Sequence, residues 1–217
     1  MPKLKWTVKI GGSLFPHHAK KLLKKLLGEE IIIIPGGGEF ADKIREYNNK
    51  IGFSDTANHE AAILSMDIMG ILLADLIKGA EATHTIKDAR KIKKDGKIPI
   101  LLPSRILHYI DPLKHSWKVT SDSIAFYISK LIDTKLLIAT DVDGIYTTKP
   151  TKKGAKLINE ITAKKLLTFG ETAVDEELPK LLLKYKSDCY IANGKHPQRI
   201  LSIIRSTDTI HTKIRGD

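Results

Sequence analysis

A short apolar run that ends in two glycines lies near the start of the chain. Residues 6–10 have the pattern of a buried strand, and Gly11, Gly12 and Ser13 follow where the chain should turn into a helix. A turn without side chains exposes successive backbone N–H groups, and such turns bind anions. Lys9 stands just before the glycines and adds a positive charge at the same place. The stretch therefore predicts a phosphate-binding turn.

A second turn of the same kind follows the next apolar run. Residues 31–34 are four isoleucines, the pattern of a fully buried parallel strand, and Pro35 leads into Gly36, Gly37 and Gly38. Two glycine turns on two strands predict an enzyme that holds two phosphates facing each other.

Predicted strands alternate with predicted helices along the whole chain. Further strands are expected at residues 98–102, 135–139, 189–192 and 210–214. Helices are expected at residues 16–27, 39–50, 56–78, 122–131 and 197–204, with two or three short ones between 162 and 185. This alternation is typical of an α/β fold with a mostly parallel sheet, in which ligands bind at the carboxyl ends of strands.

The helical segment at residues 56–78 is apolar nearly all round, which predicts that it crosses the middle of the fold. Its polar members therefore need partners or a cleft to face. His59 and Asp67 are eight residues apart, slightly more than two helical turns, so they share a face. Ser121 is expected to cap the helix at residues 122–131, and residues 109–120 are expected to be irregular.

The composition narrows the class of function. Lysine and arginine total 36 against 25 acidic residues, a net charge of +11, which fits either nucleic acid or multiply anionic small molecules as partners. Aromatic residues make up 6% and do not interleave with the basic runs, as a platform for stacked bases would require. A small-molecule substrate is therefore favoured, with neither nucleic acid nor membrane as partner.

Cysteine content and hydropathy indicate a cytoplasmic protein. The single cysteine, Cys189, excludes an internal disulfide and a multi-cysteine metal site, and a buried inert thiol is expected. No apolar stretch reaches the ~18 residues that a membrane-spanning helix needs. Lys3 and Lys5 lead into a strand pattern rather than into the apolar core of a signal peptide.

Two common nucleotide signatures are missing from the sequence. It contains neither the G-x-x-x-x-G-K-[ST] motif of P-loop enzymes nor a G-x-G-x-x-G after a strand with an acid ~20 residues on. A P-loop site and a Rossmann dinucleotide site are both disfavoured.

Four motifs instead occur in one order: Lys9-x-Gly-Gly-Ser, Pro35-Gly-Gly-Gly, Asp122 within Thr-Ser-Asp-Ser, and Thr140-Asp-Val-Asp-Gly-Ile-Tyr. In these motifs the chain resembles the amino acid kinase superfamily along its full length. The resemblance implies one domain over residues 1–217 with the carbamate kinase-like fold, an open αβα sandwich around a mostly parallel sheet. It also implies an acceptor-binding lobe up to about residue 130, a nucleotide-binding lobe from about residue 131, ATP, Mg²⁺, and γ-phosphoryl transfer to a carboxylate, carbamate or phosphate.

The resemblance also assigns roles to residues. The catalytic set is Lys9 on the β- and γ-phosphates, Asp122 orienting lysine side chains, and Lys180 as a second lysine on the donor phosphates. The donor phosphates would lie on Gly11, Gly12 and Ser13, and the acceptor phosphate on Gly36, Gly37 and Gly38. The nucleotide would contact Thr140, Asp141, Asp143, Gly144 and Tyr146, the last beside the base or ribose. No protein residue is predicted to ligate a metal, because Mg²⁺ is held chiefly by phosphates and water.

Several of these residues also fit plain structural roles. Asp122 is an acid in a first helical turn, which the helix dipole favours. Asp141 and Asp143 are common turn formers. Lys180 follows a stretch, residues 172–179, that lacks the Gly-Gly-Met of the family pattern, so an exposed helix lysine fits equally. His211-Thr212-Lys213 stands where relatives have Gly-Thr, which is expected to alter the packing of the last strand.

Further stretches, at residues 35–41, 100–104, 115–117, 193–197 and 212–214, resemble archaeal kinases of methanofuran biosynthesis that act on an aminomethylfuran phosphate. This similarity implies a phosphate acceptor and a diphosphate product, and an ionised acceptor needs no general base. The acceptor pocket is expected around His59, Asp67, His115 and Trp117, with Glu60, Asp67 or Asp111 as the partner of the amine. Ordinary core packing or satisfied buried polar groups are the alternative.

Other functions stay open at this point. A uridylate kinase or an isopentenyl phosphate kinase of the same superfamily would use the same turns. A non-catalytic regulator would bind ATP without turnover, and a nucleic-acid binder would lose affinity steeply with salt. A homodimer is suggested by the superfamily alone.

Overall fold

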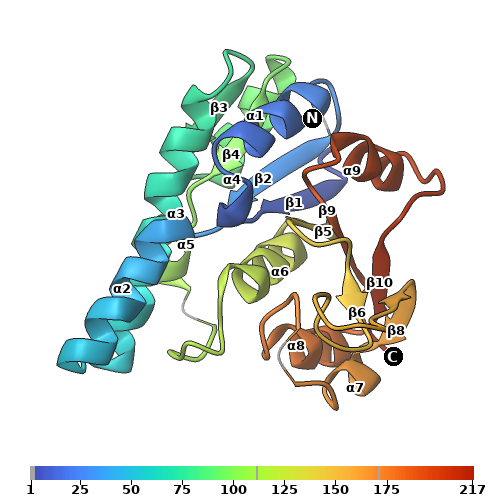
Figure 1. The fold of residues 1–217 in the computed structure, drawn as a ribbon. Helices are drawn as coiled ribbons and strands as arrows, with labels where there is room; N and C mark the ends of the chain where they lie inside the picture. The colour runs from blue at the N-terminus through green and yellow to red at the C-terminus, as the bar shows by residue number, and fades with distance from the viewer. Residues whose placement is uncertain (1–2, 111, 171) are drawn as a thin grey trace.

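The computed structural model describes residues 3–110, 112–170 and 172–217, and eight strands form its central sheet (Figure 1). In spatial order they are β3 (Ala80–Thr83), β4 (Ile98–Leu101), β2 (Ile31–Pro35), β1 (Trp6–Ile10), β5 (Lys135–Thr140), β9 (Cys189–Asn193), β10 (Thr212–Arg215) and β8 (Glu160–Thr162). The strands from β3 to β9 are parallel, and β10 runs antiparallel to β9. A small hairpin, β6 (Ile145–Tyr146) with β7 (Leu157–Ile158), stands apart from this sheet.

The four isoleucines of β2 show how the sheet binds a helical layer on each face. Ile31 and Ile33 pack into one apolar cluster, and Ile32 and Ile34 pack into the other. Successive side chains of a strand point to opposite faces, so an uninterrupted apolar strand is buried on both. The first layer consists of α1 (His17–Lys25) and α9 (Pro197–Ile204) with the end of α3 (Asp55–Asp75). The second contains α4 (Ile86–Lys94), α5 (Ser104–Tyr109), α6 (Ser121–Leu131), α7 (Ala163–Leu166) and α8 (Leu178–Tyr185).

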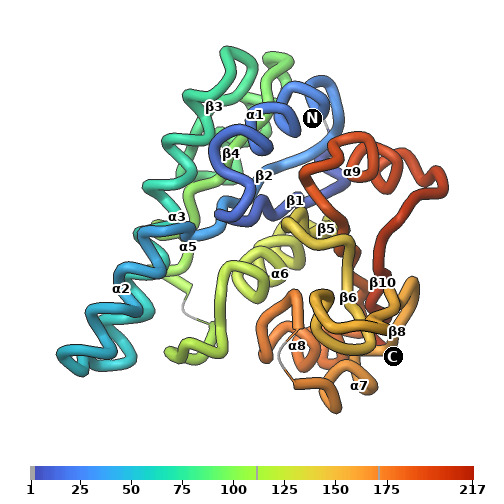
Figure 2. The backbone as a smooth tube through the Cα atoms, in the orientation of Figure 1, coloured from blue at the N-terminus to red at the C-terminus, as the bar shows by residue number. Residues whose placement is uncertain are grey.

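The long helix α3 does not cross the middle of the fold, so that prediction was wrong. It packs beside α2 (Gly38–Ile51) at one edge of the molecule, where the two helices project as a pair (Figure 2). Leu64, Ile68, Ile71 and Leu72 remain exposed on α3. One side of the helix packs on the sheet while the other carries apolar residues outward, which is why the sequence pattern is apolar nearly all round.

Local details differ from the sequence expectation near the start of α6. Thr120, not Ser121, caps the helix: its hydroxyl accepts the N–H of Asp122 at 3.4 Å, and Ser121 is already helical. Residues 80–94, to which no elements had been assigned, form β3 and α4. Tyr109 is the last residue of α5 and not part of the irregular stretch, whereas residues 110 and 112–120 are irregular, as expected.

Candidate active site

The carboxyl ends of four adjacent parallel strands meet at one edge of the sheet. In this register Lys9 of β1 lies opposite Ile34 of β2 and Ile138 of β5, and Thr140 of β5 lies opposite Asn193 of β9. The turns that follow these strands carry the motifs singled out in the sequence. The strand order therefore gathers segments that are far apart in the chain into one site.

The two glycine turns lie directly against each other. A Cβ on Gly12 would stand 2.3 Å from the Cα of Gly38, and the Gly36 N–H donates to the Ile10 carbonyl at 2.8 Å. Gly38 itself has φ +55°, a left-handed conformation that glycine adopts without strain. The turns therefore face each other as the sequence predicts, while their binding of phosphate stays a prediction.

Lys9 and Asp122 form a buried ion pair beside the turns. Val8 and Ile10 point into the α1–α9 side of the sheet, so Lys9 points to the opposite face, where α6 begins. Its Nζ lies 2.8 Å from Asp122 Oδ1, and the two side chains are 11% and 8% exposed. Asp122 Oδ1 makes no hydrogen bond to another described residue. The carboxylate is thus placed to hold the lysine head beside the glycines.

Asp175, to which the sequence analysis gave no role, fastens the start of α6. Its carboxylate accepts the backbone N–H groups and hydroxyls of both Thr120 and Ser123 at 2.6–3.1 Å. It also accepts the N–H groups of Glu177 and Leu178 at the start of α8. Burial, together with the charge of Asp122, raises the pKa of Asp175 despite these hydrogen bonds. Asp175 therefore joins the start of α8 to the start of α6, where its partners Thr120 and Ser123 stand on either side of Asp122 in the chain.

Lys180 forms an ion pair with a residue at the start of its own helix. Its Nζ lies 2.8 Å from Glu177 Oε2, and its side chain is 49% exposed. The hydrogen bond to Glu177 raises the pKa of Lys180. The amino group of Lys180 is thus paired with the carboxylate of Glu177 at the start of α8. Its contact with the donor phosphates stays a prediction.

The turn after β5 is held by residues from the end of β9 and from α9. Asp143 Oδ1 accepts hydrogen bonds from Asn193 Nδ2 at 2.9 Å and from the Arg199 guanidinium at 2.6 Å. Burial alone would raise the pKa of Asp143, but these two donors outweigh it and lower the pKa. Asp141 Oδ2 lies 3.7 Å from Lys195 Nζ. The sequence analysis gave no role to Asn193, Lys195 and Arg199, although their position at or just after the end of a strand was a usable signal.

Gly144 and Thr212 join this turn to the last strand of the chain. Gly144 has φ +154°, and a Cβ there would stand 2.2 Å from Thr212 Oγ1. The same hydroxyl accepts the N–H of Ile145 at 2.9 Å and donates to the Ile158 carbonyl at 2.6 Å. Thr212 therefore fastens the β6–β7 hairpin beside the sheet.

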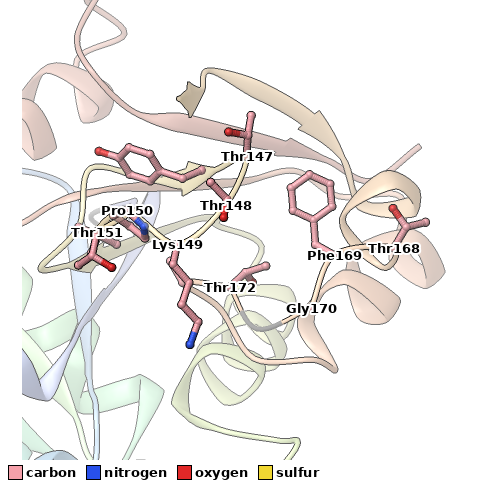
Figure 3. Close-up of a pocket in the computed structure, with 13 residues that line it drawn as sticks. Thr147, Thr148, Lys149, Pro150, Thr151, Thr168, Phe169, Gly170 and Thr172 are labelled. Atoms are coloured by element: carbon pink, nitrogen blue, oxygen red, sulfur yellow. The ribbon is translucent and has the colours of Figure 1, made fainter. Parts of the chain in front are cut away.

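A cavity of about 660 Å³ opens beside this hairpin (Figure 3). Thr147 to Thr151 line one side of it, and Thr168, Phe169, Gly170 and Thr172 line the other. Tyr146 also lines it, and burial with the nearby Asp143 raises the pKa of this phenol. The volume lies within the ~300–1,000 Å³ range of small-molecule sites.

On the other side of the glycine turns, the predicted acceptor residues form two groups. The rings of His59 and His115 stack with centroids 4.5 Å apart and an interplanar angle of 17°. His115 Nδ1 lies 2.9 Å from the Thr56 hydroxyl. The Arg45 guanidinium lies 4.7 Å from the centre of the Trp117 ring, whose buried Nε1 has no hydrogen-bond partner among the described residues.

Asp67 belongs to the second group. The hydroxyl and the N–H of Ser104 both donate to its carboxylate, and His84 Nδ1 lies 3.8 Å away. A Cβ on Gly37 would stand 2.5 Å from Ser65 Oγ, so the second glycine turn packs against α3 two residues before Asp67. Asp67 and His59 are both buried, and their shared side of α3 stays a prediction.

A groove of about 460 Å³ between α3 and α5 is lined by residues that include His59, Glu60 and Ser104. It therefore extends between the two acceptor groups. Asp111, the third carboxylate proposed for the amine, lies outside the described residues.

Comparison with known proteins identifies the family. The model of the amino acid kinase family matches residues 5–193. The chain belongs to the amino acid kinase family.

Individual amino acid kinases match over nearly the whole chain. The [5-(aminomethyl)furan-3-yl]methyl phosphate kinase of Methanocaldococcus jannaschii is 44% identical over 96% of this chain and 97% of its own length. The uridylate kinase of Methanococcus aeolicus is 28% identical over 86% of this chain and 84% of its own. The crystal structure of uridylate kinase from Archaeoglobus fulgidus superposes with a TM-score of 0.74 and 18% identity, covering 97% of this chain and 99% of that one.

These matches confirm the predicted superfamily and its αβα sandwich with a mostly parallel sheet. They also confirm that the protein is a kinase, a phosphotransferase. Within the described residues no three His, Cys, Asp or Glu side chains gather as a metal site would need, and no helix has the length and apolar character to span a membrane.

Proposed function

We propose that the protein is an ATP-dependent kinase that converts a phosphate monoester into a diphosphate, with [5-(aminomethyl)furan-3-yl]methyl phosphate as the acceptor. The observation that carries this proposal is the packing of Gly12 against Gly38 beside the buried Lys9–Asp122 pair. Two glycine turns in contact suit two phosphates that react with each other. The acceptor is supported by the 44% identity to the M. jannaschii kinase of that name.

The reaction is an in-line displacement at the γ-phosphorus of ATP. An oxygen of the acceptor phosphate bonds to this phosphorus, the bond to the β–γ bridging oxygen breaks, and its electron pair leaves with ADP. The acceptor is already ionised, so no residue has to remove a proton. Lys9 neutralises charge that grows on the transferring group, and Asp122 fixes its ammonium in position. Bound Mg²⁺ would further neutralise the phosphates, which would supply its oxygen ligands together with water.

The two sides of the glycine turns fit different substrates. Donor phosphates would lie on Gly11, Gly12 and Ser13, and the nucleoside would occupy the cavity beside Tyr146. In this arrangement residues up to about 130 would bind the acceptor and the donor phosphates, and the rest of the chain would bind the nucleoside.

The acceptor would bind beyond Gly36, Gly37 and Gly38, toward α3. Its amine would pair with Asp67 or Glu60, since a carboxylate is the natural partner of an ammonium group. The furan would lie near His59, His115 and Trp117, whose flat rings suit another flat ring.

Two wider properties complete the proposal. The exposed apolar side chains of α3 favour a homo-oligomer that covers them. The single buried cysteine fits a reducing, cytoplasmic environment.

Phosphorus NMR of the protein with Mg-ATP and separate acceptors tests the reaction. We expect a new diphosphate signal with the aminomethylfuran phosphate and none with UMP or isopentenyl phosphate. Lys9→Ala should lower the rate about 1,000-fold, because a positive charge at the transferring group is lost. Lys91→Ala, at an exposed position on α4, should leave it unchanged.

Each other outcome has a defined meaning. Turnover of UMP or isopentenyl phosphate instead would retain the chemistry and reject the acceptor. Binding of ATP without turnover of any acceptor would point to a regulator built on the same fold. Full activity of Lys9→Ala would reject the role given to Lys9.

A further inference from the structure

The donor side of the site holds a lysine to which the family resemblance gives no role. ATP carries several negative charges, and Lys9 is a single cation already paired with Asp122. Lys180, the expected second lysine, is paired with Glu177 at 2.8 Å. Lys195 is a further cation close to the first glycine turn.

The backbone at Lys195 is fixed against the donor turn. The N–H of Gly194 donates to the Thr140 carbonyl at 2.7 Å. A Cβ on Gly194 would stand 2.4 Å from Leu14 Cδ1, in the short helix Gly12–Leu14 that forms the donor turn. The next N–H, of Lys195 itself, donates to Asn193 Oδ1 at 3.0 Å. The backbone of Lys195 thus lies next to the point where β5, β9 and the donor turn are in contact.

The side chain of Lys195 is held only weakly. Its Nζ lies 3.7 Å from Asp141 Oδ2, and the two side chains are 39% and 42% exposed. A long, exposed pair of this kind contributes little stability, so the ammonium can exchange its partner at low cost. Arg199 is different, since its guanidinium is bound to Asp143 at 2.6 Å and only 20% exposed. Of these two cations after β9, Lys195 is the one able to move to a ligand.

We propose that Lys195 is a second cationic ligand of the donor phosphates, held near them by Asp141 until ATP binds. The inference rests on the proposed function and deepens it. When the bond between the γ-phosphorus and the bridging oxygen breaks, its electron pair passes to the β-phosphate of ADP. An ammonium from the β9 end of the sheet would stabilise that charge while Lys9 stabilises the transferring group. A flexible lysine suits this task, because it can follow a point charge without a fixed plane.

Nucleotide binding tests the contact without any turnover. We expect Lys195→Ala to weaken binding of an ATP analogue with a non-hydrolysable β–γ bridge about 10- to 100-fold, the range for a lost charge-assisted hydrogen bond. AMP lacks the β- and γ-phosphates and so would not lose this hydrogen bond. The affinity of Lys195→Ala for AMP should therefore stay within about threefold of the wild-type affinity. Isothermal titration calorimetry gives both affinities. An equal loss for both ligands, or no loss for the analogue, would overturn the proposal.

Two further variants separate charge from structure. Lys195→Arg keeps the positive charge and should recover most of the analogue affinity, whereas Lys195→Gln keeps a polar side chain without the charge and should not. Lys180→Ala is the matched control from the family pattern, and it should change the analogue affinity less than Lys195→Ala does. If Lys180→Ala has the larger effect, the assignment of the second cation to Lys195 is wrong. Thermal unfolding shows whether each variant is folded.

Turnover distinguishes this inference from the function on which it rests. If the wild type forms diphosphate, Lys195→Ala should lower kcat about 100-fold, as loss of a stabilising donor to transition-state charge does. If Lys195→Ala has the kcat of the wild type, the inference is rejected but the proposed kinase activity is not. A wild type that forms no diphosphate with any acceptor would reject the proposed function instead, and the binding experiment would still decide whether Lys195 contacts the phosphates.

Discussion

Asp143 is a carboxylate whose partners decide its charge state. Asn193 and Arg199 come from β9 and α9 and donate to the same oxygen, at 2.9 and 2.6 Å. Burial raises the pKa of the group, but the two hydrogen bonds bring it below its ordinary value of 3.8. The ionised form is therefore the one that the fold stabilises.

Replacing this carboxylate should change stability in a pH-dependent way. The pKa is lower in the folded than in the unfolded chain, so the charge stabilises the fold above pH ~4 and this contribution is lost as the pH falls through the folded pKa. Asp143→Asn should lower the free energy of unfolding at pH 7 by about 1 kcal/mol, a modest figure because water screens the pair. Urea unfolding at pH 7, 5 and 3 should show the difference shrinking toward pH 3. A difference that grows on acidification would contradict this reasoning.

At the scale of elements, the contact between the two glycine turns leaves no room for side chains. A Cβ on Gly12 would meet the Cα of Gly38 at 2.3 Å and its backbone nitrogen at 2.8 Å. Both neighbours are backbone atoms, so the turns after β1 and β2 would have to separate.

Gly12→Ala should therefore impair catalysis more than stability. We expect kcat/KM to fall more than about 100-fold, because a small displacement of aligned reactants is costly, and unfolding to become easier by about 1–3 kcal/mol. Gly28→Ala is the control: Gly28 has φ +91° with open space around it, so alanine should cost about 1 kcal/mol there and spare activity. Equal activities of the two variants would mean that the contact does not align the substrates.

At the scale of the whole molecule, one side of α3 carries apolar side chains that the single chain leaves exposed. Leu64, Ile68, Ile71 and Leu72 recur at helical spacing and are 40–55% exposed. Such a stripe on a helix at the edge of the molecule suits burial against a second copy.

Light scattering coupled to size exclusion tests the oligomer. The wild type should have at least twice the mass of one chain, and the double variant Leu64→Glu, Ile71→Glu should have the mass of one chain, because charge cannot be buried without a partner. Ile210→Glu places the same charge on another exposed apolar residue, outside α3, and should not change the mass. A wild type that runs as a monomer would reject the proposed oligomer.

The sequence by itself determined the frame of the site. Periodicity is local, so the four isoleucines of β2 predicted a strand that is buried on both faces, as the structure shows. Glycines directly after strands marked both turns, and the order of four motifs led to the family, which the comparison confirmed. The same local patterns led to a wrong position for α3, because a run of apolar residues does not show whether the chain itself buries them.

Only the tertiary structure decided how distant segments hold the site together. Asp175 reaches Thr120 across 55 positions, and Arg199 reaches Asp143 across 56. No spacing in the sequence relates such residues, since they meet only when the order of the strands brings their loops to one edge of the sheet. The sequence thus set the chemistry available at each strand end, and the topology of the sheet selected which groups act together.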